Sequence, residues 1–356
     1  MYKELNDSIL NVEKIKKITG LEFKYEFEKE KQAIELEQQK KDALLSEEAK
    51  QQKIVRNSFI FGFTLMVLLV LVVLRSFLQK RKANLILASQ NEEIATQRDK
   101  INAQHTAITD SIVYAKRIQK GVLPPDAYID EILPESFILF KPKDVVSGDF
   151  YWIRQINDYI VLAVADCTGH GVPGAIMSML GISFLNEIVQ KREITQANQV
   201  LNELRKQIKL ALRQTGRKGE ADDGMDIAMC VLDTKTKSLQ YSGAFNPLYL
   251  IQNYELSEIK ADKMPIGYYP NEKSDFSNHE IQLKKGDIFY LFSDGFRDQF
   301  GGKKGFKYRA SNFQRILVEN HNKPMIIQKE MLEDELKSWM NGYEQTDDII
   351  VMGVRV

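Results

Sequence analysis

Cysteine is nearly absent from this chain of 356 residues, which contains only Cys167 and Cys230. Two cysteines cannot build the disulfide framework of a small secreted domain. Net charge is absent as well, because 49 Lys and Arg side chains offset 49 Asp and Glu side chains. A neutral chain lacks the basic character of nucleic-acid-binding proteins, so no nucleic-acid partner is expected. A charged fraction of 28% argues against a multi-span membrane protein.

The zero net charge is the sum of unlike segments. Residues 1–57 hold 12 basic and 12 acidic side chains, and residues 58–74 hold none. Residues 75–120 hold 9 basic and 4 acidic side chains, whereas residues 121–356 hold 28 basic and 33 acidic ones. A charge-free stretch, followed by a basic segment and then an acidic domain, is typical of a membrane-anchored protein.

The charge-free stretch predicts a transmembrane helix over residues 58–78. It reads NSFIFGFTLMVLLVLVVL from residue 57 to residue 74. A helix of this length spans roughly 31 Å, close to the ~30 Å hydrocarbon core, if Arg75 snorkels to the headgroups. A buried core helix is the alternative, and the distance from the N-terminus disfavours a signal peptide. Slightly denser basic charge after the span places the C-terminal side in the cytoplasm, in a single-pass inner (cytoplasmic) membrane protein.

Two charged helical segments flank the predicted span. Residues 1–57 contain no proline and one glycine, and they predict a helical stalk outside the cytoplasm. The stretch KYEFEKEKQAIELEQQKKDALLSEEAKQQK resembles the helical tail that follows tetratricopeptide repeats in bacterial membrane sensors, although no repeat of about 34 residues is present. A stalk without ligand recognition is the alternative interpretation.

Residues 79–120 predict a signalling helix that forms a coiled coil. Apolar residues recur every seven positions, at Leu87, Ile94, Ile101, Ile108, Ala115 and Val122. The positions four residues further on are mostly polar: Asn91, Arg98, His105 and Gln119, with Ile112 the apolar member. Such a weak seam suits a marginal parallel homodimer that has two registers for signal transmission, and a stiff spacer is the alternative. His105 is interpreted as a polar interruption of the seam rather than a metal ligand.

The remaining residues, 121–356, predict an α+β domain. It begins after Gly121 and the Pro124-Pro125 pair, where short apolar runs separated by turns replace the long helix. Strands are expected at residues 137–140, 150–154, 160–165, 225–232, 238–241, 248–251, 288–292 and 349–354. Helices are expected at residues 173–190, 196–214, 311–319 and 324–340. Strands in succession, separated by paired helices, favour a sandwich over a repeated βαβ unit.

Acidic residues fall at the tips of several predicted strands: Asp149, Asp166, Asp294, Asp347 and Asp348. An acid at the end of a buried apolar strand is held rigidly, and a neighbouring glycine lets an ion approach the backbone. Converging carboxylates without His or Cys ligands specify a hard cation, Mg²⁺ or Mn²⁺.

From about residue 111 to residue 356 the chain resembles the SpoIIE/RsbU branch of the PP2C-like (PPM) serine/threonine phosphatases. The matching segments are AKRIQKGVLP, FKPKDVVSGDFYW, VADCTGHGVPGAIMSML, YSGAFNPLYL, PIGYY, GDIFYLFSDGF and TDDIIVMGV. The resemblance implies a PP2C-like αββα sandwich that binds two Mg²⁺ or Mn²⁺ ions. It also implies that a metal-activated water removes phosphate from phosphoserine or phosphothreonine, often on a STAS-domain regulatory protein.

The resemblance assigns roles by position. Asp166 matches the carboxylate that bridges both metals, and Cys167 would contribute its backbone carbonyl. Asp294 and Asp347 match two further metal ligands, and Asp149 matches the acid that completes the site. Asp348 ranks below Asp347 and is interpreted as a surface or neighbouring carboxylate.

Four features of the domain leave alternatives open. His170 lies four positions after Asp166 rather than directly behind it, so it is either the general acid for the leaving oxygen or a brace at a helix start. The Cys167 side chain is interpreted as a small residue in a tight loop rather than a reactive thiol. The acids of the loop at 216–224, Asp222 and Asp223, are solvated or form a weak extra metal site. Asp226 lies near the metals or bonds to a neighbouring strand.

These patterns together predict a membrane-anchored, metal-dependent phosphoprotein phosphatase controlled by rotation or dimerisation of the residue 83–120 helices, which would move the 173–190 helix. A pseudophosphatase scaffold that binds a phosphorylated partner without turnover is the alternative. A diguanylate cyclase is disfavoured because SGDFYW lacks the paired acids of that family.

Overall fold

A computed structural model describes residues 2–217, 219–220, 222–270 and 275–356, without the side chains of residues 2–11 and 13. The chain divides into two compact units, Met1–Lys100 and Ile101–Val356. One α-helix, α1 (Tyr2–Val122), supplies the described part of the first unit and the first residues of the second.

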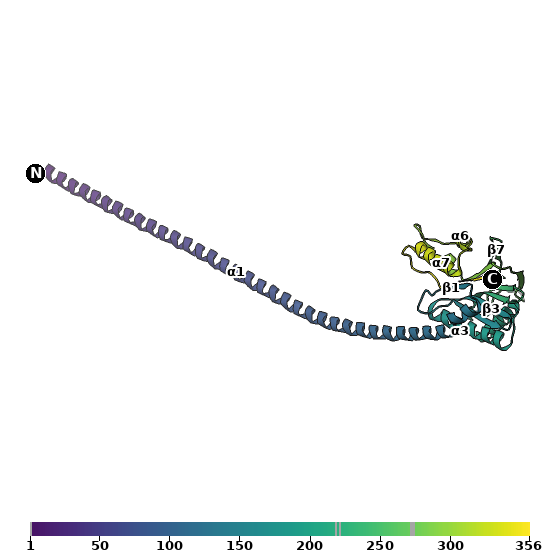
Figure 1. Ribbon diagram of the computed structural model, residues 1–356. Coiled ribbons are helices and arrows are strands. Elements are labelled where there is room, and N and C mark those ends of the chain that lie inside the picture. Colours follow the sequence, from purple (N-terminus) through teal and green to yellow (C-terminus); the bar gives the residue numbers. More distant parts are fainter. Residues whose placement is uncertain (1, 218, 221, 271–274) are drawn as a thin grey trace. The chain divides into compact units, whose positions relative to one another are not determined.

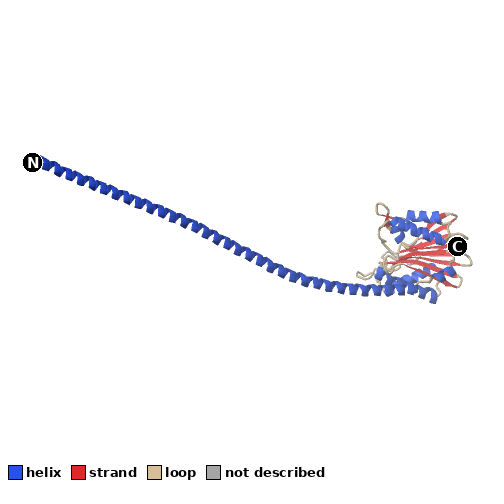
Figure 2. Cartoon of the chain, turned by 60° about the vertical axis from the view of Figure 1, so that its left-hand side comes forward, coloured by secondary structure: helices blue, strands red, loops and turns tan. Residues whose placement is uncertain are grey.

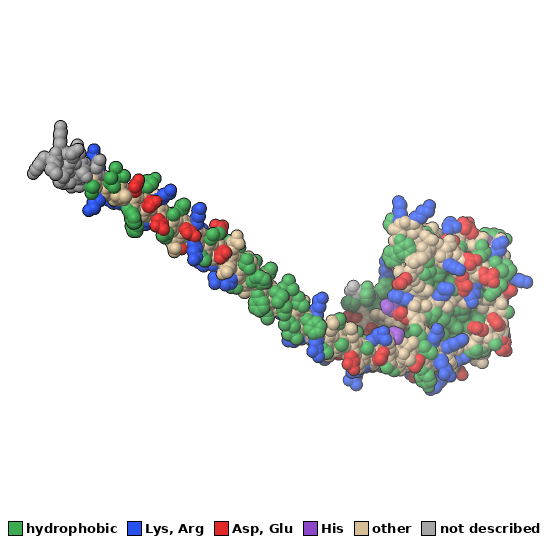
Figure 3. Space-filling model, turned by 90° about the vertical axis from the view of Figure 1, so that its left-hand side faces the viewer, with side chains coloured by type: hydrophobic (Ala, Val, Ile, Leu, Met, Phe, Trp, Pro, Cys, Tyr) green, Lys and Arg blue, Asp and Glu red, His purple; other side chains and the backbone are tan. Residues whose placement is uncertain are grey.

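The first unit is helical throughout and buries none of its described side chains. Its apolar stretch at residues 58–78 is visible in Figure 3 as a band of hydrophobic side chains between charged segments. Two described helical stretches, in Lys14–Ile132 and Gly171–Lys191, contain a window long and apolar enough to cross a membrane. The apolar window in Gly171–Lys191 is 50% buried inside the protein. The window in Lys14–Ile132 is 0% buried, and this exposure is weak evidence for a membrane anchor.

The second unit contains two five-stranded antiparallel sheets (Figure 2). One sheet has the order β1-β12-β9-β6-β7 and the other β2-β3-β4-β5-β8. The strands of the first sheet are β1 (Ser136–Lys141), β12 (Ile349–Arg355), β9 (Ile288–Phe292), β6 (Leu248–Gln252) and β7 (Glu255–Ile259). Those of the second are β2 (Phe150–Ile156), β3 (Tyr159–Cys167), β4 (Met225–Asp233), β5 (Ser238–Ala244) and β8 (His279–Gln282).

Helices cover the outer face of each sheet, which makes an αββα sandwich (Figures 1 and 2). The second sheet is covered by α3 (Gly171–Leu185), its π-helical continuation η1 (Asn186–Lys191) and α4 (Ala197–Ala211). The first sheet is covered by α6 (Ala310–Asn320) and α7 (Met325–Met340). The remaining short elements are α2 (Asp126–Ile132), α5 (Gly295–Asp298), β10 (Phe300–Gly301) and β11 (Phe306–Lys307).

Both faces of both sheets are buried, so the central strands are continuously apolar. In β3, Val161 and Ala163 pack against the helices, whereas Leu162 and Val164 pack between the two sheets. A strand with one solvent-exposed face would alternate apolar and polar residues instead. The apolar run that ends at Asp166 is therefore the signature of a central sandwich strand.

The predicted sandwich and its eight strands are confirmed, with boundaries that shift by a few residues. The edge strands β7 and β8 were not predicted, because their side chains are largely polar and partly exposed. The short helix α2 was also missed. The expected helix at residues 173–190 ends as a regular α-helix at Leu185 and continues as η1.

Candidate active site

A cavity of about 290 Å³ opens at the strand ends where the two sheets meet. Five carboxylates line it: Asp166, Asp222, Asp226, Asp294 and Asp347. Cys167, Thr168, Gly169 and His170 form another part of its wall, and Gly267 and Tyr268 face it from a different loop. Among the described lining residues there is no lysine or arginine, so the cavity is strongly negative unless protons or cations offset the charge.

The second sheet contributes a pair of acids. Asp166 lies near the end of β3, and its cross-strand partner in β4 is Asp226. Directly opposed side chains in an antiparallel pair have Cβ atoms about 5 Å apart, which brings the two carboxylates to the same edge of the sheet. Of the two alternatives for Asp226, the structure shows the one near the acid cluster.

The first sheet contributes two more acids from adjacent strands. Asp294 follows β9, and Asp347 precedes β12. The buried Ser293 ties these strand ends together, because its backbone N–H donates to the Ile350 carbonyl at 3.0 Å and its Oγ accepts from the Ile350 N–H at 2.9 Å. Asp347 Oδ1 in turn accepts from the N–H of Asp348 at 2.9 Å. These bonds fix where both carboxylates enter the cavity.

Of the two alternatives for Asp348, a surface or a neighbouring carboxylate, the structure excludes the surface one, because Asp348 is 2% exposed. Its Oδ1 accepts a hydrogen bond from the Lys143 N–H and its Oδ2 one from the Gly148 N–H, both at 2.7 Å. A buried carboxylate that accepts two backbone hydrogen bonds is a strong loop anchor. Asp348 therefore holds the segment that leads into Asp149.

Asp149 directly follows Gly148, whose N–H is bound by Asp348, and it is 2% exposed. Its Oδ2 is buried without a hydrogen-bond partner among the described residues. A buried, unpartnered carboxylate oxygen is costly, so it is expected to carry a proton or to face a cation.

Burial of like charges raises the pKa of these carboxyls. The pKa of Asp166 rises to about 10 because of burial and because Asp149, Asp294 and other acids repel its charge. Burial and the charge of Asp294 raise the pKa of Asp226 to about 7. Burial likewise raises the pKa of Asp149 well above its ordinary value, and that of Asp294 to a lesser degree. The cluster therefore holds protons at neutral pH when no cation is bound.

Glycine is required beside the acids, where the loop after β3, the segment before β2 and the first turn of α3 meet. A Cβ on Gly148 would lie 2.5 Å from the Gly169 carbonyl oxygen, and one on Gly174 would lie 2.7 Å from the Gly148 Cα. Gly169 itself has a φ of +82°, which side-chain-bearing residues rarely adopt. These glycines pack the loop after β3 against the segment before β2, rather than forming a nucleotide-binding loop.

His170 precedes the first turn of α3 and makes no capping hydrogen bond there. Its Nδ1 lies 2.7 Å from Asp144 Oδ2, and both side chains are about half exposed, at 51% and 44%. This contact braces the loop after β3 against the segment before β2. Asp144 was not predicted as a site residue, although it lies inside the FKPKDVVSGDFYW segment.

The loop before β4 forms the remaining wall of the cavity. Thr168 Oγ1 accepts a hydrogen bond from the Gly224 N–H at 3.0 Å, which joins this loop to the one after β3. Asp222 lines the cavity, and the Asp223 carbonyl accepts from Gln214 Nε2 at 2.6 Å. Lys218 and Ala221 of the expected 216–224 loop lie outside the described residues. Cys167 is 4% exposed, and burial raises the pKa of its thiol, so it is not a reactive thiolate.

Gln119 connects α1 to this site. From the sequence it was interpreted only as a polar position of the coiled-coil seam. Its side-chain amide donates to the Ser147 carbonyl at 2.6 Å and to Ser178 Oγ of α3 at 2.9 Å. Its Oε1 accepts from the Ser147 N–H at 3.1 Å. One buried amide thus joins α1, α3 and the residues immediately before Asp149.

The donor set fits hard divalent cations. All of its charged donors are carboxylate oxygens, and the orphaned Asp149 Oδ2 marks unsatisfied negative charge. Within the part of the chain that the structure describes, no group of three or more His, Cys, Asp or Glu side chains is arranged as a ready metal cluster. Any cation would therefore need water or backbone carbonyls in addition to pairs of these acids, as Mg²⁺ commonly has.

Comparison with known proteins gives a family match over most of the second unit. Residues 157–356 match the family model described as stage II sporulation protein E (SpoIIE). The chain is 25% identical over 219 residues to the phosphoserine phosphatase RsbU of Bacillus subtilis. That match covers 60% of each protein, so the chain spans less than two thirds of this curated relative.

Solved structures show the same fold. The chain is 33% identical to the SiaA-PP2C domain of Pseudomonas aeruginosa, with a TM-score of 0.65, and the match covers 71% of this chain and 99% of that domain. The PP2C phosphatase domain of SpoIIE from Bacillus subtilis, with part of its regulatory domain, matches at 19% identity and a TM-score of 0.51 over 62% of this chain and 63% of that one. With the αββα sandwich and the acids at its strand ends, these matches show that the chain belongs to the SpoIIE family and carries a PP2C-like domain.

Proposed function

We propose that this chain is a metal-dependent phosphoprotein phosphatase that hydrolyses phosphoserine or phosphothreonine. The observation that carries the proposal is the convergence of acids from the strand ends of both sheets on one cavity, where Asp166 and Asp226 of one sheet meet Asp294 and Asp347 of the other. The match to RsbU, a phosphoserine phosphatase, supports the same chemistry. A pseudophosphatase scaffold would not need to retain all of Asp149, Asp166, Asp294 and Asp347.

In the proposed mechanism, the residues of this chain hold the metal ions in position. When bound, two Mg²⁺ or Mn²⁺ ions would activate a water for attack on phosphorus and offset the charge of the phosphoryl oxygens. Asp166, Asp294, Asp347 and Asp149 would hold those ions, together with the Cys167 carbonyl. The buried strands fix these groups, and Asp348 and the glycine contacts fix the loops around them. The role of His170 as a general acid stays a prediction.

The proposal also names the substrate, the membrane anchor, the oligomeric state and the helix that controls the site. Because RsbU is named a phosphoserine phosphatase, we propose a phosphorylated regulatory protein as the substrate. The family resemblance of the sequence motifs makes a STAS-domain protein our candidate. The exposed apolar stretch of α1 supports a single-pass anchor in the inner membrane, with the catalytic domain in the cytoplasm. The heptad series around Leu87 supports a parallel homodimer. Gln119 supports control of the site by α1, because it links that helix to the segment before Asp149.

Replacing the proposed bridging acid tests the chemistry. We expect Asp166→Asn to lower Mn²⁺-dependent hydrolysis of p-nitrophenyl phosphate by at least about 100-fold, because the carboxylate charge that holds the metals is lost. The matched control is Asp130→Asn, which alters an exposed acid of α2 and should keep activity within about twofold of wild type. Activity indifferent to both metal and Asp166 would overturn the enzyme proposal and leave the scaffold.

Metal binding should depend on pH. The raised pKa of Asp166 means that the metal-free native state binds more protons than the unfolded chain between about pH 4 and pH 10. Stability without metal should therefore fall as the pH rises through this window, and protons should compete with Mn²⁺ at its lower end. We expect the Mn²⁺-induced rise in Tm, measured by thermal denaturation, to be larger at pH 8 than at pH 6. A metal effect that is equal at both pH values would contradict the proposed competition.

Removing the α1 link should weaken metal binding. Gln119→Leu keeps the side-chain size but leaves the N–H and carbonyl of Ser147 without this partner. Since that segment leads into Asp149, we expect the Mn²⁺ concentration for half-maximal activity to rise about tenfold, which corresponds to ~1.4 kcal/mol. Gln104→Leu, at an exposed position of α1, is the control and should leave metal dependence unchanged. An unchanged metal requirement in Gln119→Leu would argue against this coupling.

Cysteine crosslinking tests the proposed dimer. The native thiols Cys167 and Cys230 are buried, so a cysteine introduced at Leu87 would be the accessible one. We expect Leu87→Cys to form disulfide-linked dimers in membranes, because a coiled-coil seam brings equivalent residues together. Ser89→Cys lies on nearly the opposite side of the helix and should crosslink poorly. Equal crosslinking at both positions would contradict the seam, and unchanged phosphatase activity in the crosslinked dimer would contradict control through it.

A further inference from the structure

The catalytic cavity is too small and too negative to bind a protein partner by itself. Its volume of about 290 Å³ accommodates little beyond a phosphorylated side chain, and five carboxylates line it. If the proposed phosphatase activity holds, most of the affinity for a protein substrate has to come from surfaces outside the cavity. A second hollow on the same unit has the size and the charge for this task.

This second hollow, the α4 groove, has a volume of about 840 Å³. It lies along α4 and the segment that follows it, and four basic and two acidic side chains line it. The basic members are Arg205, Lys206, Lys209 and Arg213, and the acidic ones are Glu203 and Asp275. An excess of positive charge here contrasts with residues 121–356 as a whole, which hold 28 basic and 33 acidic side chains.

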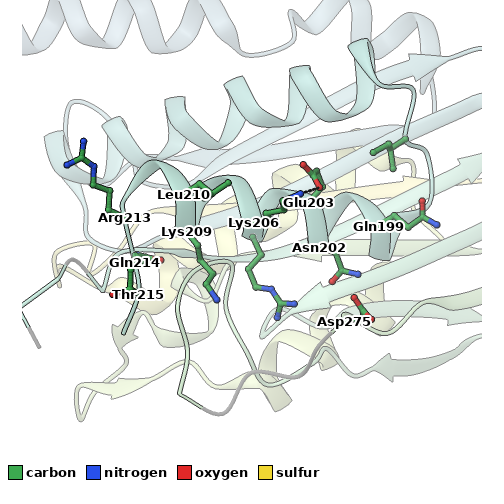
Figure 4. A pocket seen from close by; sticks show the side chains of 12 residues that line it. Gln199, Asn202, Glu203, Lys206, Lys209, Leu210, Arg213, Gln214, Thr215 and Asp275 are labelled. Carbon is green, nitrogen blue, oxygen red and sulfur yellow. Dashed lines mark ion pairs between the residues drawn. The ribbon is translucent and has the colours of Figure 1, made fainter. Parts of the chain in front are cut away.

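Three of the basic side chains lie on α4, and the fourth follows it. Lys206 and Lys209 are three residues apart, which places them on one helix face, whereas Arg213 lies beyond the end of α4 at Ala211 and has a φ of +54°. Lys206 is 67% exposed, and its ion pair with Glu203 is long, at 3.7 Å. Figure 4 shows Asn202 and Lys209 leaving α4 on the side where Asp275 lies. Polar and charged groups thus line an elongated surface rather than a closed pocket.

The α4 groove shares a wall with the catalytic cavity. Gln214 lines the groove, and its Oε1 accepts a hydrogen bond at 2.8 Å from the N–H of Tyr268, which lines the cavity. Lys209 Nζ lies 5.8 Å from the centroid of the Tyr268 ring. A peptide segment that passes over Tyr268 would contact both hollows.

We propose that the α4 groove is a docking surface for an acidic segment of the phosphorylated protein substrate, and this inference rests on the proposed function. The groove would attract Asp and Glu side chains through Lys206 and Arg213, while the phosphorylated residue enters the acidic cavity beyond Tyr268. Opposite signs in adjacent hollows would also set the direction in which the substrate binds. Electrostatic attraction between the groove and the substrate raises the rate and the specificity of their association, and dissolved salt weakens it.

Binding of synthetic peptides to the full-length chain in detergent tests the docking surface. The probes are fluorescein-labelled phosphoserine peptides that carry four Glu residues on one side, at a series of spacings, and matched peptides with Gln in their place. For the best spacing, we expect fluorescence anisotropy to show about tenfold tighter binding of the Glu peptide at low salt, and little difference at ~0.5 M NaCl.

Charge reversal identifies the surface. K206E/R213E should abolish the preference for the Glu peptide, whereas K284E/K285E, two exposed lysines before β9 at the far end of that strand from Asp294, should retain it. The neutral pair K206Q/R213Q serves if the reversed variant does not fold. Loss of preference in both charge-reversed proteins, or in neither, would overturn the proposal.

Turnover of a small substrate separates this inference from the proposed function. Hydrolysis of p-nitrophenyl phosphate should be the same in wild type and K206E/R213E, because neither residue lines the catalytic cavity. A wild-type chain that fails to hydrolyse it refutes the phosphatase, whereas the peptide-binding result decides the docking surface in either case.

Discussion

Mutual repulsion among buried carboxylates is the constraint on which the second unit depends. Asp149 and Asp348 are each 2% exposed, and Asp166, Asp226 and Asp294 lie around the same cavity. Two like charges about 5 Å apart repel by roughly 3 kcal/mol at an effective dielectric constant of about 20. The cluster is therefore stable only with protons or cations among its members, which agrees with its fit to divalent ions. Burial, and then repulsion by the neighbouring acids, raises the pKa of Asp166 accordingly.

The sandwich resists this repulsion because its strands are anchored on both faces. Residues of β3 pack alternately against the helices and between the sheets, so the tip that carries Asp166 cannot move without disturbing two cores. Hydrogen bonds between Ser293 and Ile350, and backbone N–H groups that donate to Asp348, then fix the loops at the other strand ends. Rigid elements rather than a flexible loop thus hold the acids together, as a preorganised metal site requires.

The cavity and the α4 groove, to which we assign chemistry and substrate recognition, differ in the sign of their charge. The acidic cavity suits cations and the phosphoryl group, whereas the groove along α4 carries the basic side chains. Gln119 lies on a third side of the site, where α1, α3 and the segment before Asp149 meet.

The sequence alone determined the apolar stretch of α1, the sandwich class and the acids at the strand tips. Those features depend on local patterns, such as a run of residues without charge or an apolar strand that ends in Asp166. The tertiary structure decided what depends on pairing between distant segments: Asp226 opposite Asp166, Asp348 as a buried anchor of the segment before Asp149, and Asp144 beside His170. No local pattern predicts such contacts, because the partners of Asp348 at Lys143 and Gly148 are about 200 residues away and meet it only when both sheets have formed.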